Sequence, residues 1–172
     1  MRIRVMVLSV VLTACCISHI QAETVGLWSI TRDQTNGNPG LAIIEATNRL
    51  APAEHSTPDS FHVRCIETGM INVYVGTSGF WGYGGSGAKT RVIYNVHGKP
   101  KVEERWDVYS SGQLVGIPYT HTAKDLIMSL PSAGAITFTV YAREYGNNGT
   151  ATFSLEGFAA IRKLLADGCK WP

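Results

Sequence analysis

The sequence has little charge, few cysteines and only one long apolar run. Charged residues make up 16% of its 172 positions, and lysine and arginine form no cluster. Because nucleic-acid binding needs a basic patch or stripe, this absence argues against nucleic acid as a partner. The apolar run, residues 5–14, is shorter than the roughly 20 residues that a membrane-spanning helix needs. The composition therefore excludes two broad classes, nucleic-acid binders and proteins that span a membrane with helices.

Signatures of metal binding and of nucleophilic catalysis are also missing. No two histidines lie at the spacing of metal ligands, and Gly-x-Ser-x-Gly does not occur. Residues 82–87 have the glycine spacing of a phosphate-binding loop, but Ala88 occupies the lysine position. The sequence thus predicts no metal, no cofactor and no enzymatic activity. None of the histidines beyond the N-terminal segment lies in a recognisable nucleophile context. They are His55, His62, His97 and His121.

Acidic residues concentrate at Glu103, Glu104 and Asp107. Glycoside hydrolysis would need two carboxylates that face each other across a cleft. In a strand, Glu103 and Asp107 share one face with Arg105 between them, and we expect Arg105 to pair with them. We therefore interpret this group as a solvated strand face.

The first 22 residues have the organisation of a signal peptide. Arg2 and Arg4 form a basic region, residues 5–14 form an apolar region, and Ala22 is a small residue at a plausible cleavage position. Cleavage there would leave residues 23–172 as a single β-rich domain in the periplasm. Its net charge would be zero instead of +2, because the two arginines leave with the signal peptide.

Lipoprotein processing is an alternative, because residues 12–15 (Leu-Thr-Ala-Cys) resemble a lipobox. Lipidation of Cys15 would then anchor the chain to a membrane of the envelope. We expect membrane association only in that case.

Two cysteines remain in the mature chain, Cys65 and Cys169, which lie 104 positions apart. Export brings them into an oxidising compartment, where pairing is favoured. We therefore expect a Cys65–Cys169 disulfide, which would stabilise the fold by roughly 4–5 kcal/mol in the chain-entropy model. Two unpaired thiols, one of them buried, are the alternative.

Short alternating segments separated by turn residues fill the mature chain. Residues 61–66 and 70–77 alternate around Gly69 and predict a β-hairpin. Seven or eight such strands indicate a mainly β fold, an antiparallel β-sandwich or a strongly bent sheet. Two short helices are predicted, at residues 123–130 and 158–167. Other predicted strands include residues 25–31, 90–96, 102–109, 135–145 and 150–156.

The C-terminal segment combines the last strand with the second helix. Phe153 and Leu155 alternate along the strand, while Phe158 and Ile161 lie on one face of the helix. Gly168 is predicted to end this helix with a left-handed cap. The expected disulfide would therefore link the C-terminal helix to the strand that carries Cys65.

A glycine-rich segment, residues 76–87, carries the aromatics Phe80, Trp81 and Tyr83. Exposed aromatics on a loop commonly bind a partner or a glycan, and these three residues form the candidate partner-binding loop. In the alternative, Phe80 and Trp81 fold back over an open end of the sheet.

Several of these features occur in the order found in one known family. They are Trp28, the Cys65 strand, the segment Val92–Val96, Trp106 and the final Cys169. With this pattern the chain resembles the VasI/TagO-like exported proteins associated with bacterial type VI secretion. The resemblance implies a periplasmic accessory protein that binds a partner in the envelope and is not an enzyme. The aromatic loop suggests an alternative, an inhibitor or glycan-binding module that acts on cell-wall enzymes or peptidoglycan.

Overall fold

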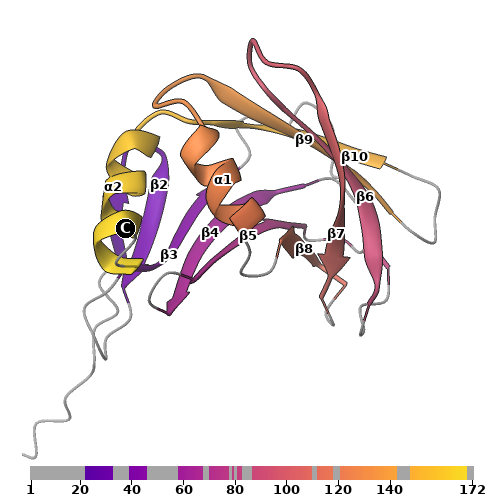
Figure 1. Ribbon diagram of the computed structural model, residues 1–172, viewed down its shortest axis with the longest axis horizontal. Coiled ribbons are helices and arrows are strands. Elements are labelled where there is room, and N and C mark those ends of the chain that lie inside the picture. The colour runs from indigo at the N-terminus through magenta and orange to yellow at the C-terminus, as the bar shows by residue number, and fades with distance from the viewer. Residues whose placement is uncertain are drawn as a thin grey trace, which may run out of the picture.

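The computed structural model describes residues 22–32, 39–45, 58–67, 70–77, 79, 81–82, 87–109, 112–117, 121–142 and 148–169. Within these ranges the chain forms a strongly curved sheet with two helices beside it (Figure 1). The strands are β1 (Ala22–Val25), β2 (Trp28–Arg32), β3 (Pro39–Glu45), β4 (Ser60–Glu67), β5 (Met70–Gly76), β6 (Lys89–Val96), β7 (Val102–Val108), β8 (Leu114–Ile117), β9 (Ala135–Tyr141) and β10 (Asn148–Ser154). The helices are α1 (His121–Ser129) and α2 (Phe158–Cys169). Neither α1 nor α2 has the length and apolar character that crossing a membrane requires.

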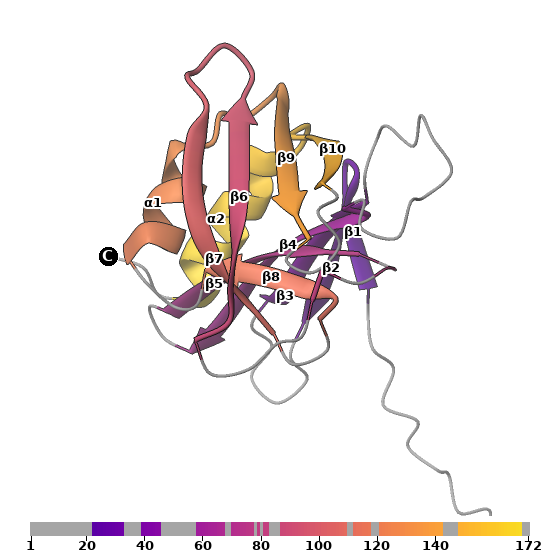
Figure 2. The ribbon, with the colours of Figure 1, turned by 90° about the vertical axis from the view of Figure 1, so that its right-hand side faces the viewer.

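The ten described strands form one antiparallel sheet, in the order β1-β2-β3-β4-β5-β8-β7-β6-β9-β10. The sheet bends at β8, which separates β1–β5 from β7, β6, β9 and β10 (Figure 2). β8 pairs with β5 over four register positions but with β7 over only two. Gly116 allows this close approach, because a Cβ there would lie 2.3 Å from the carbonyl oxygen of Val73.

The two parts of the sheet bury their aromatic side chains against each other. Phe61 of β4 lies at the centre, with ring-centroid distances of 5.8 Å to Trp28 and 5.2 Å to Phe138 of β9. Phe153 of β10 lies 5.8 Å from Phe61 and completes the cluster. Burial of each such side chain contributes roughly 1.5–3 kcal/mol, so this contact holds the bent sheet closed.

These observations confirm the predicted mainly β, antiparallel fold with two helices. The described residues contain ten strands, more than the predicted seven or eight. One reason lies at Gly26, where φ is +61° and the chain turns between Val25 and Trp28. The sequence predicts one strand over residues 25–31, whereas this turn makes two strands, β1 and β2.

α2 links the end of the chain to β4. Its buried side chains are Phe158, Ile161, Leu165 and Cys169, and the helix packs against β3 and β4. Cys169 forms a disulfide with Cys65 of β4, with a Cα–Cα distance of 5.7 Å. The predicted disulfide between sheet and C-terminal helix is therefore confirmed. Gly168 does not end α2 as predicted, because the helix continues to Cys169, where the disulfide holds it.

Candidate ligand-binding groove

Trp81 is a core residue. Its side chain is fully buried, and its backbone N–H donates to the carbonyl oxygen of Gly112 at 2.8 Å. Trp81 is therefore not an exposed member of a partner-binding loop, which corrects that interpretation of the sequence. The other two aromatics of that candidate site, Phe80 and Tyr83, lie outside the described residues, as does Cys15.

Ser60 and His62 lie side by side on β4. The Nε2 atom of His62 is 2.7 Å from Ser60 Oγ, and Ser60 Oγ donates to Asp59 Oδ1 at 3.1 Å. Ser60 has a single hydroxyl proton, which can go to Asp59 or to His62, and His62 Nε2 donates or accepts according to its tautomer. Burial lowers the pKa of His62, and the nearby Asp59 carboxylate partly opposes this shift.

The carboxylates of Glu103 and Asp107 are both bonded to cations of β6. Arg91 donates to the two oxygens of Glu103 at 2.8 and 2.7 Å, and Lys89 Nζ lies 2.7 Å from Asp107 Oδ1. The hydrogen bonds from Arg91 lower the pKa of Glu103. Glu103 and Asp107 share the solvated face, as predicted, but they pair with β6 and not with Arg105. The register of β6 against β7 explains the difference, because it places Lys89 directly opposite Asp107 and Arg91 diagonally opposite Glu103.

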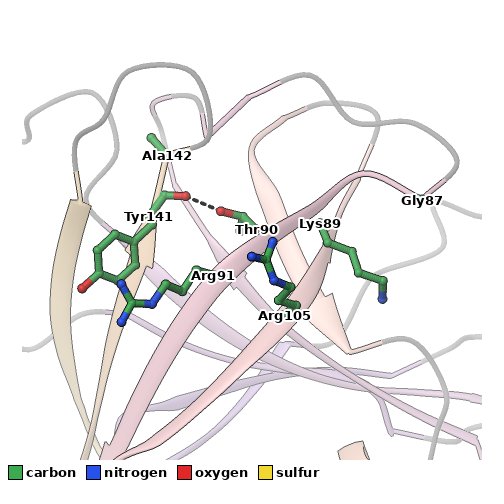
Figure 3. A pocket seen from close by; sticks show the side chains of 7 residues that line it. All are labelled: Gly87, Lys89, Thr90, Arg91, Arg105, Tyr141 and Ala142. Atoms are coloured by element: carbon green, nitrogen blue, oxygen red, sulfur yellow. Dashed lines mark hydrogen bonds between the residues drawn. The ribbon is translucent and has the colours of Figure 1, made fainter.

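A groove of about 470 Å³ opens where β6 and β9 separate. Toward the start of β6, the last register pair between the two strands is Val92–Val140. Past this pair, Thr90 Oγ1 donates to the carbonyl oxygen of Tyr141. Since side chains alternate along a strand, Lys89 and Arg91 point outward while Thr90 points inward. The groove is lined by Gly87, Lys89, Thr90, Arg91, Arg105, Tyr141 and Ala142 (Figure 3).

Two arginines oppose each other at this groove. Arg91 of β6 and Arg105 of β7 are direct register partners, and like charges at such positions weaken the pairing of strands. Arg91 is held by Glu103 and lies over the Tyr141 ring, 4.6 Å from its centroid. Arg105 forms no ion pair with a carboxylate of the described residues. Figure 3 shows that the Lys89 amine extends away from Tyr141, which leaves Arg105 as the cation next to Arg91.

Uncharged polar side chains continue this face beyond Tyr141. The hydroxyls of Thr139 and Thr150 lie 2.9 Å apart, and those of Thr137 and Thr152 also lie 2.9 Å apart. Asn148 of β10 is the register partner of Tyr141. We call these four threonines and Asn148 the threonine shelf; it places hydroxyl and amide groups beside the aromatic ring.

A second hollow, of about 370 Å³, lies between β7, β8 and the start of α1. Its inward-facing carboxylate, Glu104, accepts hydrogen bonds from Trp106 Nε1 at 2.8 Å and from Tyr94 Oη at 3.4 Å. Burial, together with this carboxylate, raises the pKa of Tyr94 to about 12. Both oxygens of Glu104 are engaged at the edge of the core, so Glu104 has a structural role.

Sequence reasoning did not identify the groove. The alternation Lys89-Thr90-Arg91 was the available signal, because it places two cations on one face of a strand. Tyr141 lies 50 positions further along the chain and reaches Arg91 only through the pairing of β6 with β9. Among the described residues, no three or more His, Cys, Asp or Glu side chains are grouped so that they could hold a metal ion.

The chain matches no protein-family model, and no curated protein matches it in sequence. It is similar to a solved structure, the crystal structure of invasion-associated protein B from Bartonella henselae. The sequences are 18% identical, the match covers 85% of this chain and 96% of that chain, and the TM-score is 0.50. At this identity the likeness concerns the fold alone.

Proposed function

We propose that this chain is an exported protein of the bacterial envelope that acts by binding and not by catalysis. Its binding surface is the outward face of β7, β6, β9 and β10. The order of basic, apolar and small residues at the N-terminus supports export. The Cys65–Cys169 disulfide supports a mature location in an oxidising compartment such as the periplasm.

The groove carries this proposal. It is a concave site at which cations from β6 and β7 lie beside the Tyr141 ring, and concave sites with a few convergent polar groups are where ligands bind most often. The side chains that could support catalysis are instead engaged with one another in hydrogen bonds and ion pairs. The Ser60 hydroxyl is shared between Asp59 and His62, and the carboxylates of Glu103 and Asp107 are bonded to Arg91 and Lys89.

Two kinds of partner fit an envelope-binding protein. The resemblance to VasI/TagO-like proteins suggests a component of a type VI secretion system. The groove favours a second candidate, in which the protein binds cell-wall glycans or enzymes that act on them, because Tyr141 stands beside hydroxyl-bearing side chains. In this second candidate the groove replaces the loop of Phe80, Trp81 and Tyr83 as the binding surface.

Site-specific photo-crosslinking in the producing cell tests the proposal. A photoreactive residue at Thr150 would lie on the threonine shelf, and the same residue at Lys163, an exposed position of α2, is the matched control. We expect the tagged protein in the periplasmic fraction, crosslinks from position 150 but not from 163, and their loss when Arg105→Glu is added. Retention in the cytoplasm, or equal crosslinking from both positions, would refute the proposal.

A further inference from the structure

We propose that the groove between β6 and β9 binds the carboxylate of an acidic saccharide, such as a uronic acid, with Arg105 as its principal ligand. This inference rests on the proposed function, since it takes the same outward face as the binding surface. It names the class of ligand, which the proposed function leaves open.

The charges of the groove call for one anionic group. Lys89 and Arg91 form close ion pairs with Asp107 and Glu103, whereas Arg105 forms none among the described residues and attracts Glu103 only at longer range. Among the described residues on the outward faces of β6 and β7, three cations stand against two carboxylates, which leaves one positive charge in excess. A bound monoanion would neutralise it and would relieve the repulsion between Arg91 and Arg105 across the strand pair.

The donors of the groove suit a carboxylate better than a phosphate. The planar guanidinium of Arg105 can donate two parallel N–H bonds to a carboxylate. Phosphate sites commonly add backbone N–H groups from a helix N-terminus or a glycine-rich nest. Here the groove has no helix N-terminus among its lining residues, and β6 is paired with β7 from Lys89 to Tyr94, so side chains supply most of the donors on that side.

The outward face that extends from Arg105 past Tyr141 suits a sugar better than a peptide. Tyr141 lines the groove, and the threonine shelf continues the face over β9 and β10, so both offer hydroxyl groups that can exchange hydrogen bonds with the hydroxyls of a sugar ring. Protein interfaces instead centre on buried aromatic or apolar anchors. The large apolar side chains that are exposed among the described residues, Leu27, Val102 and Met128, do not line the groove. Its volume of about 470 Å³ lies within the range of roughly 300–1,000 Å³ typical of small-molecule sites.

Isothermal titration of the disulfide-bonded residues 23–172 tests this assignment. The probes are a tri-galacturonic acid, the matching neutral trigalactose, and inorganic phosphate at the same pH and salt concentration. We expect the acidic trisaccharide to bind at least tenfold more tightly than the other two. Equal binding of the neutral sugar, tighter binding of phosphate, or no binding of the acid would each overturn the proposal.

Three variants locate the site. Arg105→Gln should weaken binding of the acid at least tenfold, and Arg105→Lys should restore only part of it, because lysine keeps the charge but loses the two-pronged geometry. Lys163→Gln, which removes an exposed cation from α2, should leave binding unchanged. Without ligand, the melting temperature of Arg105→Gln should equal or exceed that of the wild type, since a repulsive pair is removed. Unchanged affinity in Arg105→Gln would place the site elsewhere and refute the assignment.

The two experiments fail separately. Crosslinking from position 150 without binding of the acidic trisaccharide would refute the ligand class and leave the binding surface intact. Binding of the acid without crosslinking from position 150 would refute the proposed envelope partner and leave the groove as an acidic-sugar site.

Discussion

Loss of the Cys65–Cys169 disulfide should cost a large share of the folding free energy. The bond closes a loop of 104 residues, for which the chain-entropy model gives about 4–5 kcal/mol at 25 °C. A domain of this size has a urea m-value of about 2 kcal/mol per molar. The urea midpoint should therefore fall by about 2 M in Cys65→Ala, in Cys169→Ala and in the double variant. Because the total stability of such domains is about 5–15 kcal/mol, the variants should fold at best marginally.

The comparison between variants is the sharper part of this prediction. A single bond is lost in each single variant and in the double variant, so the three midpoints should agree within the small packing differences between the two sites. Cys169 is fully buried and Cys65 only partly, which should make Cys169→Ala slightly the less stable. Wild type reduced with dithiothreitol should fall to the same level. A double variant whose loss equals the sum of two large single losses would contradict the reasoning, because the two cysteines would then act independently.

Three further predictions concern the core and the pH dependence. Trp81→Ala should cost about 3–5 kcal/mol in urea unfolding, because Trp81 is fully buried; a loss below about 1 kcal/mol would place it at the surface. Gly116→Ala should cost about 1–3 kcal/mol, because the added Cβ meets the Val73 carbonyl oxygen, and an unchanged urea midpoint would show that β8 can move away from β5. Burial lowers the pKa of His62 in the folded protein, whereas a histidine of the unfolded chain has a pKa of about 6.5. As the pH falls, His62 is therefore protonated in the unfolded chain before it is protonated in the folded protein. The contribution of His62 to stability should therefore be complete above about pH 6.5 and decline below it. Between pH 7.5 and 5.5 the urea midpoint should therefore fall less in His62→Gln than in the wild type. An equally steep fall in the variant would show that His62 is not the source of the pH dependence.

The parts of the fold that depend on local patterns could be predicted from the sequence. Alternation identifies the inward faces of β4 and β5, and Phe61, Val63, Ile71, Val73 and Val75 are indeed buried. The face of β7 that carries Trp106 and Val108 is buried, as the alternation predicts, and α2 begins at Phe158 as predicted. The disulfide followed from arithmetic, because two cysteines remain after the predicted signal peptide.

The parts that depend on contacts between distant segments could not be predicted. The partner of Glu103 is decided by the register of β6 against β7, which places Arg91 within hydrogen-bonding distance. The burial of Trp81 is likewise set by the rest of the domain, because glycine-rich sequence around it does not distinguish an exposed loop from one that packs inward. The groove itself combines residues of three strands, and no local pattern connects Tyr141 with Arg105.

Alternation along the strands also separates the residues of the core from those of the proposed binding surface. On β6, Val92 and Tyr94 point into the core, whereas Lys89 and Arg91 point outward on the same strand. On β7, Trp106 is buried against Phe138 and Arg105 faces the groove. The inward side chains hold the strands in register, so the outward ones can include the opposed pair Arg91 and Arg105 without unfolding the sheet. Arg91 and Arg105 weaken the pairing of β6 with β7, but they lie on a surface that the core does not use. This placement is the one that a ligand site would require. For this reason, substitutions at Arg105 should change binding with little effect on folding, whereas substitutions at Trp106 should change folding first.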